Sequence, residues 1–258
     1  MIRGLYTSAM GMATQKANLD VVANNIANAN TNGFRGGTAV NTSFSELLMN
    51  RVHAEPGHPT EQIIPVGRIG HGVTIAGIHT NFQQGPLEIT GGELDFAISG
   101  QGFFAVETNL NGTPTRMFTR NGAFTLTPDR VLVNHNGDRV LDSGGNHITF
   151  PENTASLVVN GEGQILVNGS VLTTLGVMHF EDTSQLRQHG YTLFAQNGAI
   201  EADFEGRVEQ GYLERSNVNI TREMVHMINI SRAFELNQRM VGIQDQTLQQ
   251  AVNEIARR

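Results

Sequence analysis

The sequence predicts an α+β protein in which long helices at the two chain ends enclose a central β-rich region. All seven prolines and 25 of the 29 glycines lie between residues 36 and 212, which leaves both ends permissive for long helices. Apolar residues recur at intervals of seven near both ends, whereas the middle holds short apolar runs separated by turn signals. We therefore expect the terminal helices to pack as a coiled-coil-like α domain, with an extended connector leading to a central β-rich domain of hairpins.

The first segment, residues 1–35, is predicted to form one helix with a narrow apolar stripe. A period of seven concentrates apolar side chains in a seam, which suits packing against another helix. The helix is expected to end within VVANNIANANTNGF, residues 21–34, because Asn and Gly tolerate the left-handed conformation that ends helices. The stripe consists of Leu5, Met12, Leu19 and Ile26, with Val22 on the same face.

The middle of the chain is predicted to be a connector, residues 36–75, and a β-rich domain, residues 76–212. The connector has three prolines, which favour an extended path after a short helical piece at Ser43–Arg51. Asn-Gly dipeptides recur in the β-rich segment and favour the positive φ angles of tight hairpin turns. They occur at 111–112, 121–122, 136–137, 160–161, 168–169 and 197–198.

The last segment, residues 213–258, is predicted to form a second helix that begins at a cap residue, Asn219, with Glu223 in its first turn. Either the two stripes pack together within one chain, or neighbouring copies complete them. The length of this helix favours the second possibility, because the first helix can cover only part of it. Its stripe consists of Ile220, Met227, Phe234, Val241, Leu248 and Ile255, with Met224 beside them.

Composition and motifs argue against several functions. The net charge of −7 disfavours nonspecific nucleic-acid binding, and the lack of cysteine excludes disulfides and thiolate metal ligands. The N-terminus shows no signal-peptide apolar run, and no stretch is long and apolar enough to span a membrane. The nine histidines form no metal-binding spacing, and Ser99 lacks the context of a nucleophile elbow. We expect no catalytic residue, no cofactor and no metal.

Four stretches resemble the flagellar rod and hook protein family. They are NLDVVANNIANANTNGFR (18–35), AISGQGFFAVE and FTRNGAFTL in the β-rich segment, and GYLERSNVNITREMVHMINISRAFELNQRMV (211–241). The resemblance covers essentially the whole chain. It implies a structural subunit that self-assembles into a helical tube, with the terminal helices around an export channel and the β domain outward.

The resemblance also implies where the protein works and with what. Such subunits leave the cytoplasm unfolded through the flagellar type III export apparatus, without a cleaved signal, and reach the basal body outside the cytoplasmic membrane. Implied partners are further copies, other rod and hook proteins and the export apparatus. The connector resembles that of distal rod proteins, so the distal rod is the predicted position. A proximal rod or hook-type paralogue is the alternative.

Two other classes were weighed against a structural, torque-transmitting rod subunit. A secreted adhesin or carbohydrate-binding module would be expected to show an aromatic platform, but the chain has no Trp and three Tyr. An enzyme acting on the cell wall would need an acid pair or a metal site. Within the rod interpretation, Asn24, Asn25 and Asn28 lie beside small residues and are predicted to add directional hydrogen bonds to a subunit-packing surface.

Overall fold

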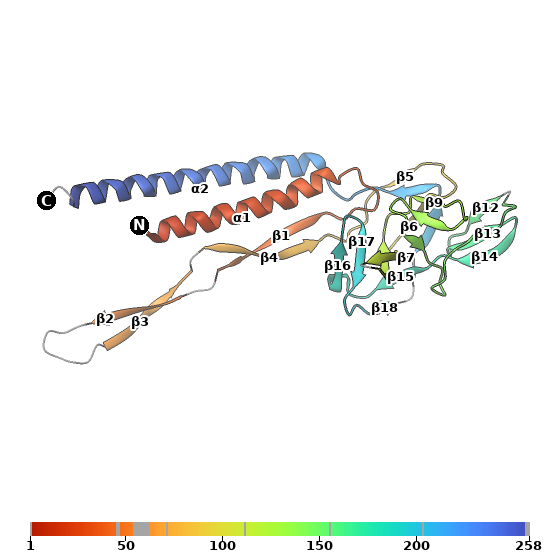
Figure 1. Cartoon of the computed structure of the whole chain (residues 1–258), viewed down its shortest axis with the longest axis horizontal. Helices are drawn as coiled ribbons and strands as arrows, with labels where there is room; N and C mark the ends of the chain where they lie inside the picture. Colours follow the sequence, from red (N-terminus) through yellow and green to blue (C-terminus); the bar gives the residue numbers. More distant parts are fainter. Residues whose placement is uncertain are drawn as a thin grey trace. The chain divides into compact units, whose positions relative to one another are not determined.

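The computed structural model describes residues 2–44, 47–53, 62–70, 72–110, 112–154, 156–202 and 204–255. Helix α1 (Ile2–Ala27) and helix α2 (Ile220–Ile255) come from the two chain ends, and the strands lie between them in sequence (Figure 1). The chain divides into two compact units. The first contains residues 1–24, 37–79 and 221–258, and the second contains residues 25–36 and 80–220.

In the first unit, α1 lies between α2 and a two-stranded ribbon (Figure 1). A Cβ atom on Gly4 would lie 2.7 Å from Nε2 of Gln244, and one on Gly11 would lie 3.0 Å from Nδ2 of Asn237. These pairs show that the helices run antiparallel, with glycines admitting the amide side chains of α2. On another face of α1, Oγ1 of Thr14 donates a 2.6 Å hydrogen bond to the carbonyl oxygen of Val73.

The predicted coiled-coil-like packing of the terminal helices is wrong. The structure has one helix from each end and a central β-rich region, so it is α+β overall. The reason lies at the helix contact, where amide side chains of α2 meet glycines of α1 instead of interlocking apolar residues. The first two residues of the predicted stripe of α2 are also exposed: Ile220 and Met224 are 37% and 51% exposed.

The connector is built of paired strands. Strand β1 (Gly37–Ser43) pairs with β4 (Val73–Thr80), and β2 (Leu47–His53) pairs antiparallel with β3 (Gln62–Ile69). The helical piece predicted at Ser43–Arg51 is therefore wrong, because cross-strand pairing overrides a weak local helix preference. Pro65 lacks an N–H group and lies beside a register shift between Met49 and Asn50, where the ladder tolerates the missing donor.

The second unit contains the remaining strands in several sheets. The largest sheet has nine strands: β16 (Leu186–His189), β17 (Leu193–Gln196), β8 (Thr113–Thr119), β7 (Phe103–Leu110), β11 (Arg139–Val140), β10 (Leu132–Asn134) and β9 (Phe124–Leu126), with β15 (Val177–Phe180) beside β7 and β18 (Glu201–Ala202) beside β15. A three-stranded sheet consists of β12 (Leu157–Val159), β13 (Gln164–Val167) and β14 (Ser170–Thr174). Two further pairs are β6 (Phe96–Ser99) with β19 (Arg207–Gln210), and β5 (Leu87–Ile89) with β20 (Tyr212–Glu214), and a short 3-10 helix spans Thr183–Gln185.

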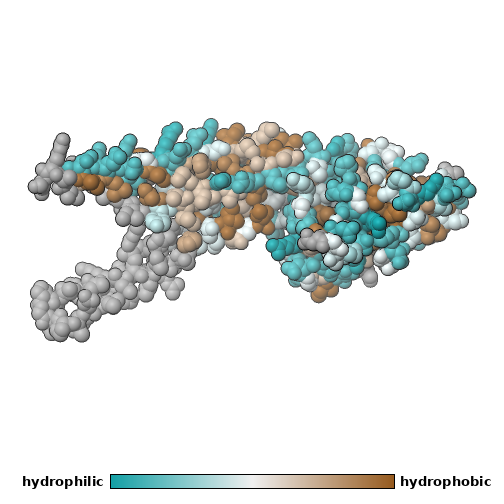
Figure 2. All heavy atoms as spheres, viewed as in Figure 1, coloured by the Kyte–Doolittle hydropathy of each residue, from teal (hydrophilic) through white to brown (hydrophobic). Residues whose placement is uncertain are grey.

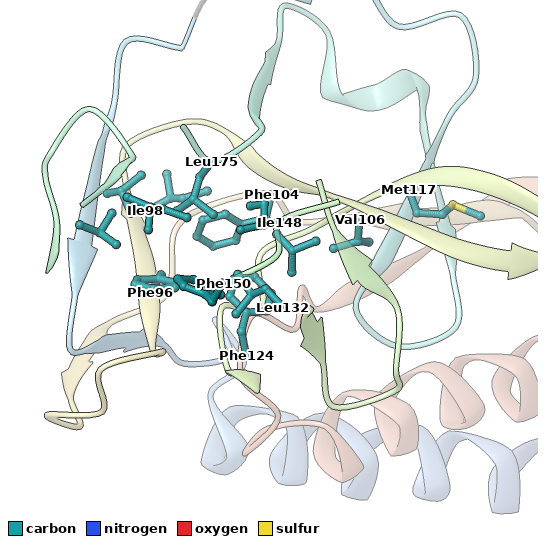
Figure 3. Close-up of a cluster of buried hydrophobic side chains, with 14 of the residues drawn as sticks. Phe96, Ile98, Phe104, Val106, Met117, Phe124, Leu132, Ile148, Phe150 and Leu175 are labelled. Atoms are coloured by element: carbon teal, nitrogen blue, oxygen red, sulfur yellow. The ribbon is translucent and has the colours of Figure 1, made fainter. Parts of the chain in front are cut away.

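Strand β7 organises the core because both of its faces are buried. Successive side chains of a strand point to opposite faces, so Phe104 and Val106 join one apolar cluster while Phe103 and Ala105 join another. The first cluster, shown in Figure 3, also receives Phe96. Because each face of β7 packs in its own cluster, the start of this strand is apolar at every position.

The structure confirms part of the prediction that Asn-Gly dipeptides form hairpin turns. Gly137 has φ +86° between β10 and β11, and Asn168 and Gly169 have φ +52° and +82° between β13 and β14. At the dipeptide at 160–161 the positive φ angle belongs to Gly163 instead, at +80°. Antiparallel pairing of β10 with β11 and of β13 with β14 follows from these turns.

Candidate functional site

Three stretches that are far apart in sequence meet inside the second unit. The segment after α1 supplies Arg35, the segment after β8 supplies Arg120, and the end of β20 supplies Glu214. Each belongs to one of the sequence motifs described above, although the sequence alone did not predict that they meet. We call Arg35, Arg120 and Glu214 the buried ion cluster.

Glu214 lies between the two arginines. Its Oε1 atom is 2.6 Å from Nη1 of Arg35, and its Oε2 atom is 3.1 Å from Nη1 of Arg120. The side chains of Arg35 and Glu214 are fully buried, and that of Arg120 is 4% exposed. The backbone N–H of Gly85 donates a 2.8 Å hydrogen bond to Oε1. Both carboxylate oxygens therefore have charged or polar partners.

Arg120 is also held by groups outside the cluster. Its Nη2 atom donates a 2.7 Å hydrogen bond to the carbonyl oxygen of Gly100, and its guanidinium carbon lies 5.2 Å from the centre of the Phe103 ring. Charge-assisted hydrogen bonds and ring contacts of this kind fix the orientation of a guanidinium. The cluster is thereby tied to the core strand β7.

Backbone contacts hold the same three segments together. The N–H of Gly33 donates a 2.8 Å hydrogen bond to the carbonyl oxygen of Glu214. Gly33 has φ +69°, and a Cβ atom there would lie 2.3 Å from the backbone nitrogen of Asn121, so only glycine fits. The segment after α1 is thus pressed against both the β8–β9 connection and β20.

Asn217 secures the segment that leads into α2. Its Oδ1 atom accepts a 2.9 Å hydrogen bond from the N–H of Gly36. Its Nδ2 atom donates to the carbonyl oxygens of Asn81 and Gln83, at 2.8 and 2.9 Å. One amide side chain therefore joins the segments on both sides of the connector to the segment before α2, which begins at Ile220 as predicted from Asn219.

The electrostatics of the cluster favour fixed geometry over net stabilisation. Burial lowers the pKa of Arg120 from its usual value to about 10, while Glu214 acts to raise it and Arg35 to lower it. Two positive charges share one negative charge, and within the described residues Nε of Arg120 and Nε and Nη2 of Arg35 have no hydrogen-bond partner. Burying such charges costs about as much free energy as their attraction returns. The cluster can therefore hold the three segments of the second unit in one arrangement.

The stripe residues predicted on α1 are partly covered by the chain itself. Val22 is buried at 7% exposure, and the other four are half-buried. Among the predicted amides, Asn24 is exposed, whereas Asn25 and Asn28 are 4% and 8% exposed. Oδ1 of Asn28 accepts a 3.2 Å hydrogen bond from Oγ1 of Thr31. The half-buried residues are Leu5, Met12, Leu19 and Ile26.

The stripe residues predicted on α2 are less covered. Ile220 and Met224 are exposed, and the next four in the stripe are half-buried. Ile255 ends the helix, and its side chain lies outside the described residues. The structure thus does not gather all of these residues into one surface. The half-buried ones are Met227, Phe234, Val241 and Leu248.

Within the part of the chain that the structure describes, no group of three or more His, Asp or Glu side chains could hold a metal ion. Neither of the two helices, as described, has the length and apolarity needed to cross a membrane. His147 bonds Glu107 through Nε2 at 2.9 Å, but both side chains are about one-third exposed.

Sequence reasoning missed the buried ion cluster because it treated the motifs separately. Arg120 could have indicated a buried charge, because it is the one charged residue of FTRNGAFTL and lies between Phe118 and Phe124. A charge in such a place needs a partner of opposite sign when it is buried. Glu214 and Arg35 could not be chosen as its partners without the fold.

Family models of known proteins match both ends of this chain and part of its β-rich segment. Residues 5–35 match a family model described as flagella basal body rod protein, residues 97–167 match the flagellar hook protein FlgE/F/G D1 domain, and residues 209–254 match the flagellar basal body rod FlgEFG protein C-terminal. The three models contain Arg35, Arg120 and Glu214, one in each.

Curated relatives are similar along their whole length. The flagellar basal-body rod protein FlgF of Caulobacter vibrioides is 32% identical, covering 100% of this chain and 99% of the relative. FlgG of Borreliella burgdorferi is 34% identical over 96% of this chain and 97% of the relative. FlgG of Bacillus subtilis is 30% identical over 98% and 99%, respectively.

Proposed function

The chain belongs to the family of flagellar basal-body rod proteins and is a structural subunit of the rod, and we propose that its copies assemble into a helical tube of the distal rod. In this tube the terminal helices surround the export channel, and the β-rich unit faces outward and transmits torque. The observation that carries the proposal is the match over the full chain, with three rod and hook models in order along it.

The connector supports the distal position within the rod. It resembles the extended stretch that distal rod proteins carry between the first helix and the β domain. Its described residues form the strand pairs β1–β4 and β2–β3. The curated relatives carry both the names FlgF and FlgG. A proximal rod or hook-type paralogue is the alternative, and the filament experiment below separates a rod from a hook.

The proposed partners are further copies, other rod and hook proteins and the export apparatus. We propose that the subunit passes through that apparatus without a cleaved signal and works outside the cytoplasmic membrane, with no catalytic role. The four predicted segments, 1–35, 36–75, 76–212 and 213–258, would then serve as inner helix, connector, outer domain and inner helix. The apolar stripes and the exposed Asn24 are proposed contacts between subunits.

The proposal is tested by assembling the purified full-length protein and imaging it by electron microscopy. Straight tubes with a central channel are expected for a rod subunit. Curved tubes would indicate a hook-type paralogue. Protein that forms no filament at any concentration, alone or with other rod proteins, would refute the proposed self-assembly.

A further inference from the structure

Helix α2 carries a second, exposed apolar stripe outside its contact with α1. Five large apolar residues there are each about half exposed, from 47% for Met240 to 60% for Leu236. Figure 2 shows apolar surface over part of the two helices. A monomer rarely exposes so many large apolar side chains in one row unless they mark an interaction site. We call these residues the outer stripe: Val225, Ile228, Leu236, Met240 and Ile243.

The outer stripe is separate from the face that packs on α1 within the chain. That inner face carries Asn237 and Gln244, which lie against Gly11 and Gly4. Successive helical residues point about 100° apart, so Leu236 and Ile243, each one position before these amides, lie to one side of the α1 contact and not within it. The intrachain helix contact therefore leaves the outer stripe uncovered.

Helix α1 has a complementary exposed face. One face of α1 receives α2 at Gly4 and Gly11, and another receives β4 at Thr14. The third face is exposed and follows the spacing of one helix side, with small residues at both ends and opposite charges in the middle. Its members are Ala9, Ala13, Lys16, Asp20 and Ala23.

We propose that the outer stripe of α2 in one copy packs antiparallel on the exposed face of α1 in a second copy, with Arg232 opposite Asp20. This inference rests on the proposed function, because it assumes that copies assemble. The antiparallel direction follows from the chain itself: its own helices run antiparallel, and copies stacked in one rod share a polarity. A large-on-small contact lets two helices approach closely.

Charge sets the register of this contact. Asp20 and Arg232 are both exposed, and Arg232 lies within the outer stripe between Ile228 and Leu236. Placing Arg232 opposite Asp20 puts Ile243 opposite Ala9, because the residue numbers of opposed positions have a constant sum in an antiparallel pair. Met240 then lies next to Ala13, so the large side chains of Met240 and Ile243 meet alanines at one end of the row.

Lys16 fits the same register. It falls opposite Leu236, where its aliphatic stem can cover the leucine while its ammonium group stays in water. In the alternative register, in which the two helices are shifted so that Lys16 faces Arg232, like charges would come together. Charge complementarity therefore selects one register.

The inference is tested by reversing the charges of the pair. Asp20→Arg and Arg232→Asp alone are each expected to raise the critical concentration for filament assembly about fivefold to tenfold, and the double reversal is expected to restore it. The matched control is Glu235→Arg, which makes the same charge change as Asp20→Arg at an exposed position on the side of α2 beside the stripe. All variants should keep the circular dichroism spectrum of the wild type.

Cysteine cross-linking gives a second readout, which is clean because the chain has no cysteine of its own. A mixture of Ala13→Cys and Met240→Cys chains should form a disulfide-linked dimer under assembly conditions, whereas either chain alone should not. Wild-type filaments without rescue by the double reversal and without this dimer would overturn the contact and leave the proposed function standing. Wild-type protein that never assembles would refute the proposed function itself, and with it the contact.

Discussion

Neutralising Glu214 is the sharpest test of the buried ion cluster. In Glu214→Gln the side chain keeps its shape and can still accept the hydrogen bond of Gly85, but its charge is lost. Arg35 and Arg120 then remain buried with two positive charges and no counter-charge. The native cluster has one net positive charge, so the variant raises the buried charge without creating a cavity.

The magnitude follows from the geometry of the cluster. Glu214 contacts Arg35 at 2.6 Å and Arg120 at 3.1 Å, with all three side chains at least nine-tenths buried. Burial lowers the pKa of Arg120 from its usual value to about 10. Burial therefore already opposes the charge of Arg120, although Glu214 attracts it. Removing one partner of a buried pair typically costs about 3–5 kcal/mol, and we expect a loss in that range.

The assay is urea unfolding at pH 7 followed by the β signal in circular dichroism, under conditions that keep the protein monomeric. A loss of about 3–5 kcal/mol would remove much of the stability of about 5–15 kcal/mol that is usual for folded domains. The matched control is Glu88→Gln, since Glu88 pairs with Arg215 on the neighbouring strand ends but both side chains are about half exposed. Exposed pairs contribute little, so the control should unfold almost as the wild type does.

A second change separates electrostatics from packing. Adding Arg35→Met to Glu214→Gln returns the buried net charge to its native value, so part of the lost stability should come back. The reasoning would be refuted if Glu214→Gln lost no more than Glu88→Gln, or if the double variant were less stable by the full sum of both single changes.

Three further outcomes are expected. Gly33→Ala should destabilise the second unit by more than 1 kcal/mol, because of its positive φ angle and the 2.3 Å approach to Asn121; equal urea midpoints would contradict this. Burial raises the pKa of Asp142, but hydrogen bonds from Asn146, Thr173 and Gly144 bring it below the usual 3.8. Because a lowered carboxyl pKa stabilises the folded state above 3.8 and that contribution fades as pH falls through the lower folded value, Asp142→Asn should cost stability at pH 7 and much less at pH 3. Finally, Phe234→Asp should block polymerisation without changing the β signal, since it places a charge on the α1-facing side of α2; filaments of normal length would argue against that contact.

The sequence was sufficient to predict the elements that local patterns control. The absence of proline from both ends predicted two long helices, and Asn219 with Glu223 marked where α2 begins. Asn-Gly at 136–137 and 168–169 predicted hairpin turns that the structure confirms. In each case the information lies within a few residues of the feature, so no knowledge of the fold was needed.

Features that depend on contacts between distant segments were not predictable in the same way. The piece at Ser43–Arg51 has local helix preference, yet residues 47–53 pair with a strand that begins at Gln62. A seven-residue period predicted apolar interlocking of the helices, but Gly4 and Gly11 draw Gln244 and Asn237 into the contact. Periodicity identifies a face of a helix and does not identify what packs on it.

The buried ion cluster connects the two kinds of information. Arg35, Arg120 and Glu214 each belong to a stretch that local patterns identify, but only the fold of the second unit brings the three side chains together. The cluster adds little stability, because some of its buried arginine N–H groups are unpaired and it carries a net positive charge. Moving any of the three side chains out of the cluster would cost more free energy still, because a buried charge would be left without a partner. Holding three distant segments of the second unit in one arrangement is therefore a more fitting role for these residues than stabilisation alone.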